Sequence, residues 1–367
     1  MNENEILERA CGIGLADPKY RFVFAPQGFL ISQEDLEELV CLGATTMNFL
    51  AKADSWYRRE MMSSGGSHLV SILQRGIPRD YLPFGLQTAL PQITMIDTVW
   101  TENGWRVAEI DGTNRNGLGW PLVIRHLYEL PSLWKGNDEV WRDAGFGDTV
   151  QVMAHHCRFY EPYYRFFLKA VGGTLIPETE IVERIDELEA AASLLDLPIL
   201  FKGECIKRLV ELTNRIPVGI PPKHYLSSKA LLALPWETKD FLADDIARFL
   251  PKTHLLRCHA QPPEHQFFVK LLQSSGAHGT FYNDMDKFKE LATRRPQAIV
   301  QNAWPIAKRP IVFLNGDTLK EEYKFIRLSI YVSPSGEIAD ADVTASDEVI
   351  VHGNNRSIIT VPVMSNA

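Results

Sequence analysis

The stretch Thr94–Leu118 reads TMIDTVWTENGWRVAEIDGTNRNGL. It predicts two β-strands joined by a tight turn at Glu102-Asn103-Gly104 and followed by a glycine-containing loop. The second strand carries two carboxylates, Glu109 and Asp111, at alternate positions that point to the same side of a strand. The hairpin therefore predicts an acidic patch on a sheet, and its register decides which side chains share that patch.

The sequence of the turn allows two different registers for the hairpin. A three-residue loop that closes with a left-handed glycine and a G1 bulge would set Thr101 opposite Trp105 and Asp97 opposite Glu109. A two-residue Asn103-Gly104 loop would shift the register by one and move Asp97 to the opposite face. The position of Asp97 therefore depends on the turn type.

In the first register three carboxylates, Asp97, Glu109 and Asp111, project from one sheet face. Carboxylates directly opposite each other repel unless a cation lies between them. Oxygen-only ligands favour Mg²⁺ or Mn²⁺ over zinc. The spacing is equally compatible with an exposed acidic face on which Asp97 is solvated.

The composition narrows the class of protein. The chain has 367 residues, of which 45% are hydrophobic and 23% charged, values that are ordinary for a globular protein of two or three units. A net charge of −8 argues against a nucleic-acid partner. No run approaches the roughly 18 apolar residues of a membrane span. The first residues, MNENEILERA, lack the apolar core of a signal peptide, and the five cysteines are scattered, so we expect a cytoplasmic location.

The flanking segments predict a mixed α+β chain. Residues 1 to 80 are expected to be mostly helical, with a helix over Gln33–Ala53 that is capped by Ser32. A second helix is expected over Trp120–Leu130. From about Phe146, strands alternate with helices, which predicts a small parallel sheet. The expected strands are Thr149–Ala154, Leu175–Pro177 and Leu197–Phe201, and the expected helices are Glu161–Val171 and Ile185–Leu194.

The last segment, from about Leu226, carries a lysine in an apolar strand. The segment opens with Ser227-Ser228-Lys229 and a helical run, and a further helix is expected over Thr238–Phe249. The strand Gln266–Leu272 contains Lys270 and leads into the loop QSSGAHGT. A helix over Met285–Thr293, a strand Ala298–Gln301 and antiparallel strands over Tyr323–Ser333 and Val349–Val363 are expected next.

Lys270 needs a partner if it is buried, because an unpaired ammonium in an apolar run is costly. An ATP phosphate is one candidate, and the small-residue loop that follows can present backbone N–H groups to phosphates. The loop does not match the Walker pattern GxxxxGK[ST]. The alternative is a lysine on an edge strand that reaches solvent.

The order of these motifs resembles the ATP-grasp superfamily. A lysine strand, a glycine loop, a helix and a strand ending in Gln301 follow the order of its nucleotide lobe, and Asp97 with Glu109-x-Asp111 resembles its magnesium-binding segment. Here the acidic segment precedes the lysine segment, as in the circularly permuted group typified by glutathionylspermidine synthetase. The run SSKALLAL resembles the lysine-bearing helix of that group.

The resemblance implies an α+β, circularly permuted ATP-grasp fold with a small inserted parallel α/β domain. It implies three parts: residues 1–145 with the acidic hairpin, a flanking domain at 146–235, and residues 236–367 that complete the ATP-grasp unit. The implied activity joins a carboxylate to an amine through an acyl phosphate, with ATP and Mg²⁺ (or Mn²⁺), and peptide-like molecules are among the candidate substrates. The implied metal ligands are Asp97, Glu109 and Asp111; the implied nucleotide contacts are Lys229, Lys270, Ser275, Gly276, Gly279 and Gln301; Arg327 and Arg115 are the candidate catalytic cations.

The chain departs from this group in two places. Met95 stands where the group has an arginine two residues before the first aspartate, and Asp111 stands where the superfamily usually has asparagine. Arg115 or Arg125 could substitute for the missing arginine. The departures keep a second hypothesis open, a catalytically silent relative that binds a nucleotide or a partner as a regulatory module. A hydrolase that uses Glu109 and an aspartate as acid and base is a more distant third.

Overall fold

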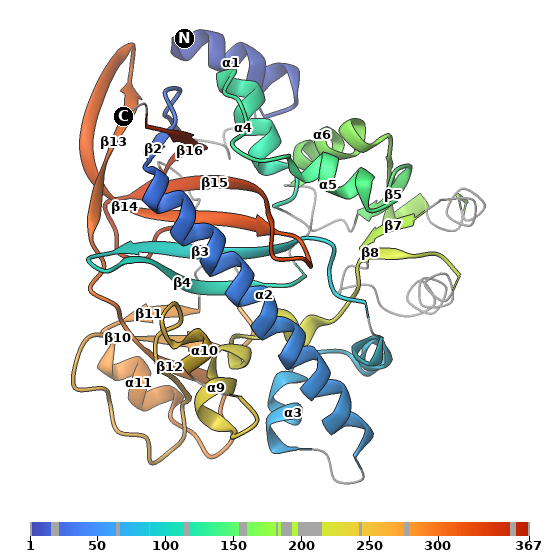
Figure 1. Cartoon of the computed structure of the whole chain (residues 1–367), viewed down its shortest axis with the longest axis vertical. Coiled ribbons are helices and arrows are strands. Elements are labelled where there is room, and N and C mark those ends of the chain that lie inside the picture. The colour runs from blue at the N-terminus through green and yellow to red at the C-terminus, as the bar shows by residue number, and fades with distance from the viewer. Residues whose placement is uncertain are drawn as a thin grey trace.

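A computed structural model of the chain describes residues 2–15, 22–63, 67–87, 89–113, 117–153, 160–180, 183–184, 193–196, 215–241, 244–274, 279–352 and 357–365. The fold is mixed α and β, with one large sheet, two four-stranded sheets and a two-stranded sheet within these ranges (Figure 1). No helix in the described ranges combines the length and the apolar character needed to cross a membrane.

The central sheet is built from both ends of the chain. The sheet has seven strands. Six of them follow the order β1-β16-β15-β14-β3-β4, and the seventh, β13, pairs with the first part of β14, from Thr318 to Phe325. All neighbours are antiparallel except β1 and β16. The strands are β1 (Val23–Phe24), β3 (Thr94–Thr101), β4 (Gly104–Asp111), β13 (Lys308–Asn315), β14 (Thr318–Val332), β15 (Ile338–Ser346) and β16 (Ile358–Thr360).

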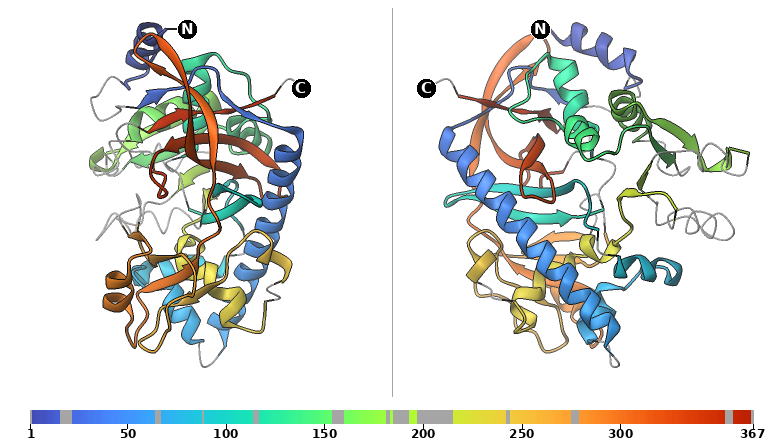
Figure 2. Two further views of the ribbon diagram at one scale, coloured as in Figure 1. Left: turned by 90° about the vertical axis from the view of Figure 1, so that its left-hand side faces the viewer. Right: turned by 45° about the vertical axis from the view of Figure 1, so that its right-hand side comes forward.

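Helix α2 (Gln33–Met62) covers one face of the central sheet (Figures 1 and 2). It begins where the sequence predicts, because the Ser32 hydroxyl accepts a hydrogen bond from the Asp35 amide in a capping box. It continues past the predicted end at Ala53. Its apolar side packs against alternate strand residues such as Ile96. Alternation then leaves the other face of these strands for the polar residues described below.

The second sheet is antiparallel and carries the predicted lysine strand. Its order is β11-β10-β12-β9, from β9 (Thr253–Leu255), β10 (Phe267–Leu271), β11 (Thr280–Tyr282) and β12 (Ala298–Asn302). Helix α11 (Met285–Leu291) covers one face through Phe288. The other face packs toward the central sheet, since Leu255 and Ile299 belong to the same apolar cluster as α2.

The third sheet is the predicted small parallel sheet. Its order is β6-β5-β7-β8, with every neighbouring pair parallel. Helix α6 (Glu161–Val171) has the predicted bounds and ends at Gly172, whose φ of 83° is left-handed. The strands are β5 (Thr149–Met153), β6 (Thr174–Pro177), β7 (Ser193–Asp196) and β8 (Val218–Ile220).

The remaining elements are short and lie around these sheets. Strands β2 (Phe29–Ile31) and β17 (Pro362–Met364) form a parallel pair. The helices are α1 (Glu3–Gly12), α3 (His68–Leu73), α4 (Trp120–Tyr128), α5 (Asn137–Asp143), α9 (Leu234–Glu237) and α10 (Asp244–Ala247). The 3₁₀ helices are η1 (Arg79–Leu86), η3 (Glu178–Glu180), η4 (His224–Ser227) and η5 (Lys229–Ala233).

Several predicted elements differ from the structure. The predicted helix Ile185–Leu194 overlaps strand β7, and residues 185–192 and the predicted strand 197–201 lie outside the described residues. Of the predicted helix Thr238–Phe249, only Asp244–Ala247 is helical. Strand β15 was not predicted. In place of one strand over Val349–Val363 the structure has β16 and β17, with residues 353–356 outside the described ranges.

Candidate active site

The acidic hairpin has the predicted pairing but not the predicted loop. Asp97 lies opposite Glu109, as in the first register. Thr101, however, faces Gly104 rather than Trp105, so the loop is Glu102-Asn103, which is neither the predicted three-residue loop nor the predicted Asn103-Gly104 loop. A β-bulge at Ala108 then shifts the register of β4 by one residue, and this restores the pairing of Asp97 with Glu109.

The shorter loop is stabilised by a contact that the local sequence does not reveal. The Thr101 hydroxyl donates to the Gly104 carbonyl at 2.7 Å, and Gly104 is left-handed, with φ 95°. Glu38, on helix α2, accepts from the Trp105 amide and from Arg106 Nη1, both at 2.9 Å. A carboxylate from a distant helix therefore fixes the turn.

The bulge at Ala108 also creates a contact with the second sheet. Ala108 has no partner in the β3–β4 ladder, and its carbonyl accepts a hydrogen bond from Lys270 Nζ at 2.7 Å. Lys270 lies in β10, as predicted, and is 5% exposed. The lysine strand is thus directed at the acidic hairpin rather than at solvent.

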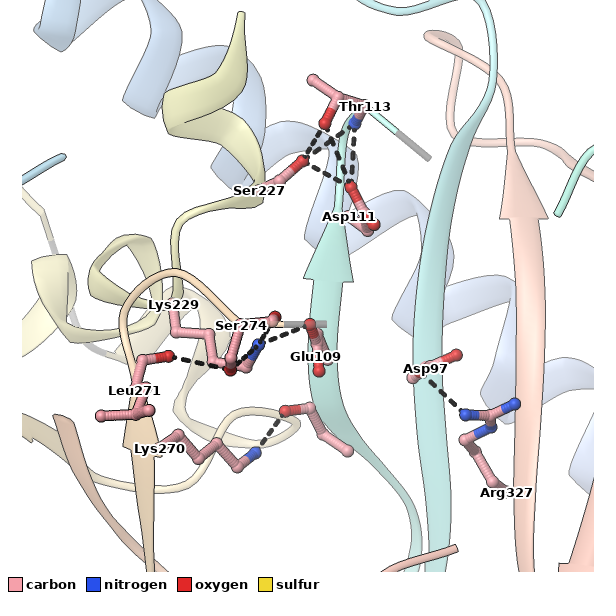
Figure 3. A network of polar contacts seen from close by, with 11 residues as sticks. Asp97, Glu109, Asp111, Thr113, Ser227, Lys229, Lys270, Leu271, Ser274 and Arg327 are labelled. Atoms are coloured by element: carbon pink, nitrogen blue, oxygen red, sulfur yellow. Dashed lines mark hydrogen bonds and ion pairs between the residues drawn. The ribbon is translucent and has the colours of Figure 1, made fainter. Parts of the chain in front are cut away.

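A second lysine reaches the same place from a third element. Lys229, the first residue of η5, places Nζ 2.9 Å from Glu109 Oε1 and donates to the Ser274 carbonyl at 2.8 Å. Figure 3 shows Lys229 and Lys270 approaching strand β4 from the same side. Lys229 is buried, whereas the Glu109 side chain is 32% exposed. Two cations from different elements therefore lie near one carboxylate: Lys229 is ion-paired with Glu109, and Lys270 binds the neighbouring Ala108 carbonyl.

The charges in this group perturb one another. Burial lowers the pKa of Lys270 to about 8, although the nearby Glu109 carboxylate opposes the shift. Burial raises the pKa of Glu109, and the Lys229 ammonium opposes that shift. Both groups are therefore held where their charged forms are disfavoured, which is typical of sites that bind ions or transfer charge.

Asp97 lies in a polar row that crosses four strands. Cross-strand partners place Asp342, Ser329, Asp97 and Glu109 side by side on β15, β14, β3 and β4. The Ser329 hydroxyl donates to Asp97 Oδ1 at 2.6 Å. Arg327, two residues earlier on β14, lies on the same face. The row therefore continues the acidic hairpin toward the middle of the sheet.

Arg327 lies between two of these carboxylates. Its Nη1 is 3.6 Å from Asp97 Oδ2, and its Nη2 donates to the Thr344 hydroxyl at 3.2 Å. Its Nε is buried and has no hydrogen-bond partner among the described residues. Although burial opposes it, Asp97, followed by Asp342, raises the pKa of Arg327. A permanently charged donor with an unsatisfied N–H lies beside the acidic hairpin.

Asp342 is a site residue that the sequence analysis missed. It is 2% exposed, and it accepts a hydrogen bond from the Tyr331 hydroxyl at 2.9 Å. Burial raises its pKa to about 7, although Arg327 opposes the shift. The signal was the alternating Asp340 and Asp342 in IADADVTAS, a strand period with acidic residues on one face.

Asp111 takes part in a different contact. It has the predicted face, opposite Met95, but its Oδ1 accepts from the Thr113 amide at 3.1 Å and from the Ser227 hydroxyl at 2.5 Å. Figure 3 shows this group apart from Asp97. Within the described part of the chain, no three His, Cys, Asp or Glu side chains are grouped so that they could share a metal ion. The cross-strand pair Asp97 and Glu109 still matches what magnesium needs from a protein, one or two carboxylates with phosphates and water completing its shell.

The loop after β10 is described only at its two ends. Of the predicted phosphate-contacting residues, Ser275 and Gly276 lie outside the described residues, as does Arg115. Gly279 is described, and a Cβ there would lie 2.4 Å from Ser274 Oγ. The close approach favours glycine next to Ser274, whose carbonyl accepts the hydrogen bond from Lys229.

Gln301 lies in β12, where it was predicted, and is 2% exposed. Its Nε2 donates to the Thr253 hydroxyl at 3.1 Å, and its cross-strand partner Phe268 is on the same face as Lys270. The chain after Gln301 borders a surface cavity of about 680 Å³ that is largely open to solvent. The cavity is lined by Glu264, His265, Gln266, Asn283, Ala303 and Pro305.

Met95 packs among apolar side chains. It lies opposite Tyr331 on β14 and contacts the cluster that includes Tyr81 and Phe84. No charged group occupies the position at which the resemblance expects an arginine.

The comparisons with known proteins concern the fold. No protein-family model and no curated protein sequence matches the chain. Among solved structures, the chain is similar to a glutathione synthetase-like effector from Globodera pallida in its apo form. The two share 12% sequence identity and a TM-score of 0.58 over 99% of this chain and 96% of that one. The chain has a glutathione synthetase-like fold. At this identity the likeness concerns the fold alone.

Proposed function

We propose that the protein is an ATP- and Mg²⁺-dependent carboxylate–amine ligase that acts through an acyl phosphate. One observation carries the proposal: Lys229 and Lys270 come from different elements and converge beside Glu109. The two buried ammonium groups would bind the phosphates of a metal–nucleotide complex, and the neighbouring acidic pair, Asp97 and Glu109, would bind its metal ion. The glutathione synthetase-like fold supports the same reading.

In this proposal the second sheet binds the nucleotide. Lys270 and Lys229 contact the phosphates, and the loop from Ser275 and Gly276 to Gly279 covers them. The adenine lies by the segment that follows Gln301, beside which the cavity provides space. Burial makes each ammonium–phosphate contact stronger than the same contact in water.

Asp97 and Glu109 are the proposed magnesium ligands, and Mn²⁺ could replace Mg²⁺. When bound, the ion would neutralise charge on the transferring phosphoryl group. Glu109 must leave Lys229 to take this role, and that exchange releases Lys229 for a phosphate. Asp111 would join the metal only if it left Ser227 and Thr113.

The proposed reaction has two steps. A substrate carboxylate oxygen attacks the γ-phosphorus, the bond to the bridging oxygen breaks, and ADP leaves. The substrate amine nitrogen then attacks the acyl carbon, phosphate leaves and the nitrogen loses a proton, which forms the amide. Arg327, whose Nη1 is 3.6 Å from Asp97 and whose Nε–H has no partner among the described residues, would hold the transferred phosphoryl group.

The proposal includes the circular permutation and the domain boundaries. Residues 1–145 and 236–367 would form the ATP-grasp unit, with 146–235 as a flanking domain. It is supported by the pairing of β3, from the first part, with β14, from the last. All four strands of the parallel sheet, β5 to β8, lie within the middle part.

One observation favours a second candidate, a silent relative that binds a nucleotide or a partner without ligation. Met95 occupies an apolar contact where the permuted group has an arginine. An enzyme without that cation would need another stabiliser, and Arg327 is the described residue best placed to serve.

The test of ligation is ADP release with ATP and Mg²⁺ against pairs drawn from amino acids, polyamines and short peptides. The Lys270→Met variant is the matched control for contaminating ATPase. Ligase function predicts ADP release that needs both a carboxylate and an amine and that is lost in the variant. Nucleotide binding without release from any pair would instead support the silent relative.

A further inference from the structure

A buried charge cluster lies outside the proposed site and is not explained by it. Asp54, on helix α2, is 2% exposed and Lys223 is fully buried. Lys223 Nζ donates to Asp54 Oδ1 and to the Gln87 carbonyl, both at 2.5 Å. The Tyr225 hydroxyl donates to the same Oδ1 at 2.5 Å, and Arg58 Nε donates to Oδ2 at 2.9 Å.

Stability alone is a poor explanation for this cluster. The desolvation of a buried ion pair offsets most of its attraction, and the best-attested use of such groups is to fix one arrangement. Burial lowers the pKa of Lys223 even though Asp54 opposes the shift. The Tyr225 ring also stacks on Tyr57 of α2, with centroids 3.7 Å apart. The cluster therefore fixes one position of the chain against α2.

The chain fixed in this way leads directly into the proposed site. We call Lys223–Lys229 the bridging segment. At its start, Lys223 and Tyr225 bind Asp54. Two and four residues after Tyr225, Ser227 donates to Asp111 at 2.5 Å and Lys229 binds Glu109 at 2.9 Å. One short segment thus contacts α2 at one end and two carboxylates of β4 at the other.

The bridging segment is held so that its two ends move together. Its turns are closed by backbone hydrogen bonds from Leu226 to Lys223 at 2.8 Å and from Ser228 to Tyr225 at 3.2 Å. Most of its side chains are buried, so a shift at one end displaces packed neighbours at the other.

We propose that Asp54 is a positioning residue for Lys229, acting through the bridging segment. It binds two side chains of the segment and so determines where the Lys229 ammonium lies relative to Glu109. Only the ligand of Lys229, a nucleotide phosphate, rests on the function proposed above. The position of Lys229 itself can be tested without any nucleotide.

The test is trace labelling of lysine amines on the folded protein, with the labelling rate of each lysine read by mass spectrometry. Lys287, on the surface of α11, is the internal reference. Asp54→Asn removes the charge that anchors the segment. Labelling of Lys229 relative to Lys287 should rise about tenfold, which corresponds to a change of roughly 1.4 kcal/mol in the opening equilibrium.

Asp35→Asn is the matched control. Asp35 is also a buried carboxylate on α2, and it accepts from Arg309 Nη1 at 2.9 and 3.0 Å and from Trp105 Nε1 at 3.0 Å. It has no contact with the bridging segment among its described partners. A loss of stability is expected in both variants, but faster labelling of Lys229 only in Asp54→Asn.

The proposal is overturned if Lys229 labels at the wild-type rate in Asp54→Asn, or if Asp35→Asn raises it equally. If Asp54→Asn does not fold, Tyr225→Phe decides by the same criterion, since it removes one donor to Asp54 and keeps the ring stack. Titration with an ATP analogue separates the two proposals. A wild type that binds no analogue refutes the nucleotide site but leaves the labelling result in force.

Discussion

Replacing Lys270 by methionine removes the ammonium group but keeps an unbranched apolar side chain of similar length to the aliphatic part of lysine. The structure gives Lys270 one protein hydrogen bond, to the Ala108 carbonyl, and Glu109 as a nearby counter-charge. Burial of the group is unfavourable on balance, because it lowers the pKa of Lys270 to about 8 from 10.5. If Lys270 had a purely structural role, its neighbours would be expected to stabilise the charged ammonium enough to offset the cost of its burial.

The expected loss concerns nucleotide affinity rather than stability. A hydrogen bond to a charged group contributes roughly 1.5–3 kcal/mol, and about 1.4 kcal/mol is tenfold in affinity. Lys270→Met should therefore weaken binding of an ATP analogue about tenfold or more. Its melting temperature should not fall, since the substitution also removes a costly buried charge.

The pH dependence has a definite sign. The pKa of Lys270 is lower in the folded chain than in the unfolded chain, so the unfolded chain binds more protons between pH 8 and 10.5. The contribution of Lys270 to stability therefore rises with pH across that window. Nucleotide binding must return the proton, so wild-type affinity should fall above pH 8 by about tenfold per unit at most. Lys270→Met should lose both effects.

The assay is competition against a fluorescent ATP analogue at pH 7 and pH 9, with thermal unfolding of the same samples. Lys320→Met is the matched control, because this lysine is exposed on β14. Equal affinity of wild type and Lys270→Met would refute the reasoning. So would a lower melting temperature with unchanged affinity, which would make Lys270 a structural residue.

Three further substitutions test neighbouring parts of the site. Glu109→Gln should weaken Mg²⁺-dependent analogue binding about tenfold. Metal-free binding should stay equal or become tighter, because Lys229 loses its ion pair. Calorimetry with and without Mg²⁺ checks this prediction, and equal losses of affinity in both conditions would contradict it. Gly279→Ala should lower stability by about 1–3 kcal/mol, because its Cβ would lie 2.4 Å from Ser274 Oγ, whereas Gly12→Ala, with no atom within 4 Å, should not; denaturant unfolding of both variants decides. Arg327→Gln should lower ligation turnover about 100-fold or more with little change in analogue affinity; steady-state ADP release measures it, and a variant that loses affinity but turns over normally would argue against the assigned role.

Local patterns were enough to predict the elements that carry the site. The alternation around the hairpin predicted β3 and β4, and the apolar run around Lys270 predicted β10. Both signals are short-range, because side chains alternate with period two along a strand. Strand β15 was missed because Asp340 and Asp342 occupy the face that usually carries apolar residues. Their burial is compensated by tertiary partners, among them Arg125 for Asp340.

The contacts within the site could not be predicted to the same extent. The pairing of Lys229 with Glu109 joins residues far apart in sequence, and no local rule specifies it. The contact of Asp111 with Ser227 has the same origin, since the two residues lie far apart in the sequence. The hairpin shows how two local differences can cancel, since a shorter loop and the bulge at Ala108 together preserve the predicted opposition of carboxylates.

We propose that Lys229, Lys270 and the acidic pair Asp97 and Glu109 form one metal–nucleotide site. Calorimetric titration of the wild-type protein with a non-hydrolysable ATP analogue, with and without Mg²⁺, tests it most directly. We expect saturable binding that is tighter with Mg²⁺, because Glu109 and Asp97 then bind the ion while Lys229 and Lys270 bind phosphates. The absence of binding up to millimolar analogue both with and without Mg²⁺, or binding that Mg²⁺ does not strengthen, would show that these four residues do not form a metal–nucleotide site.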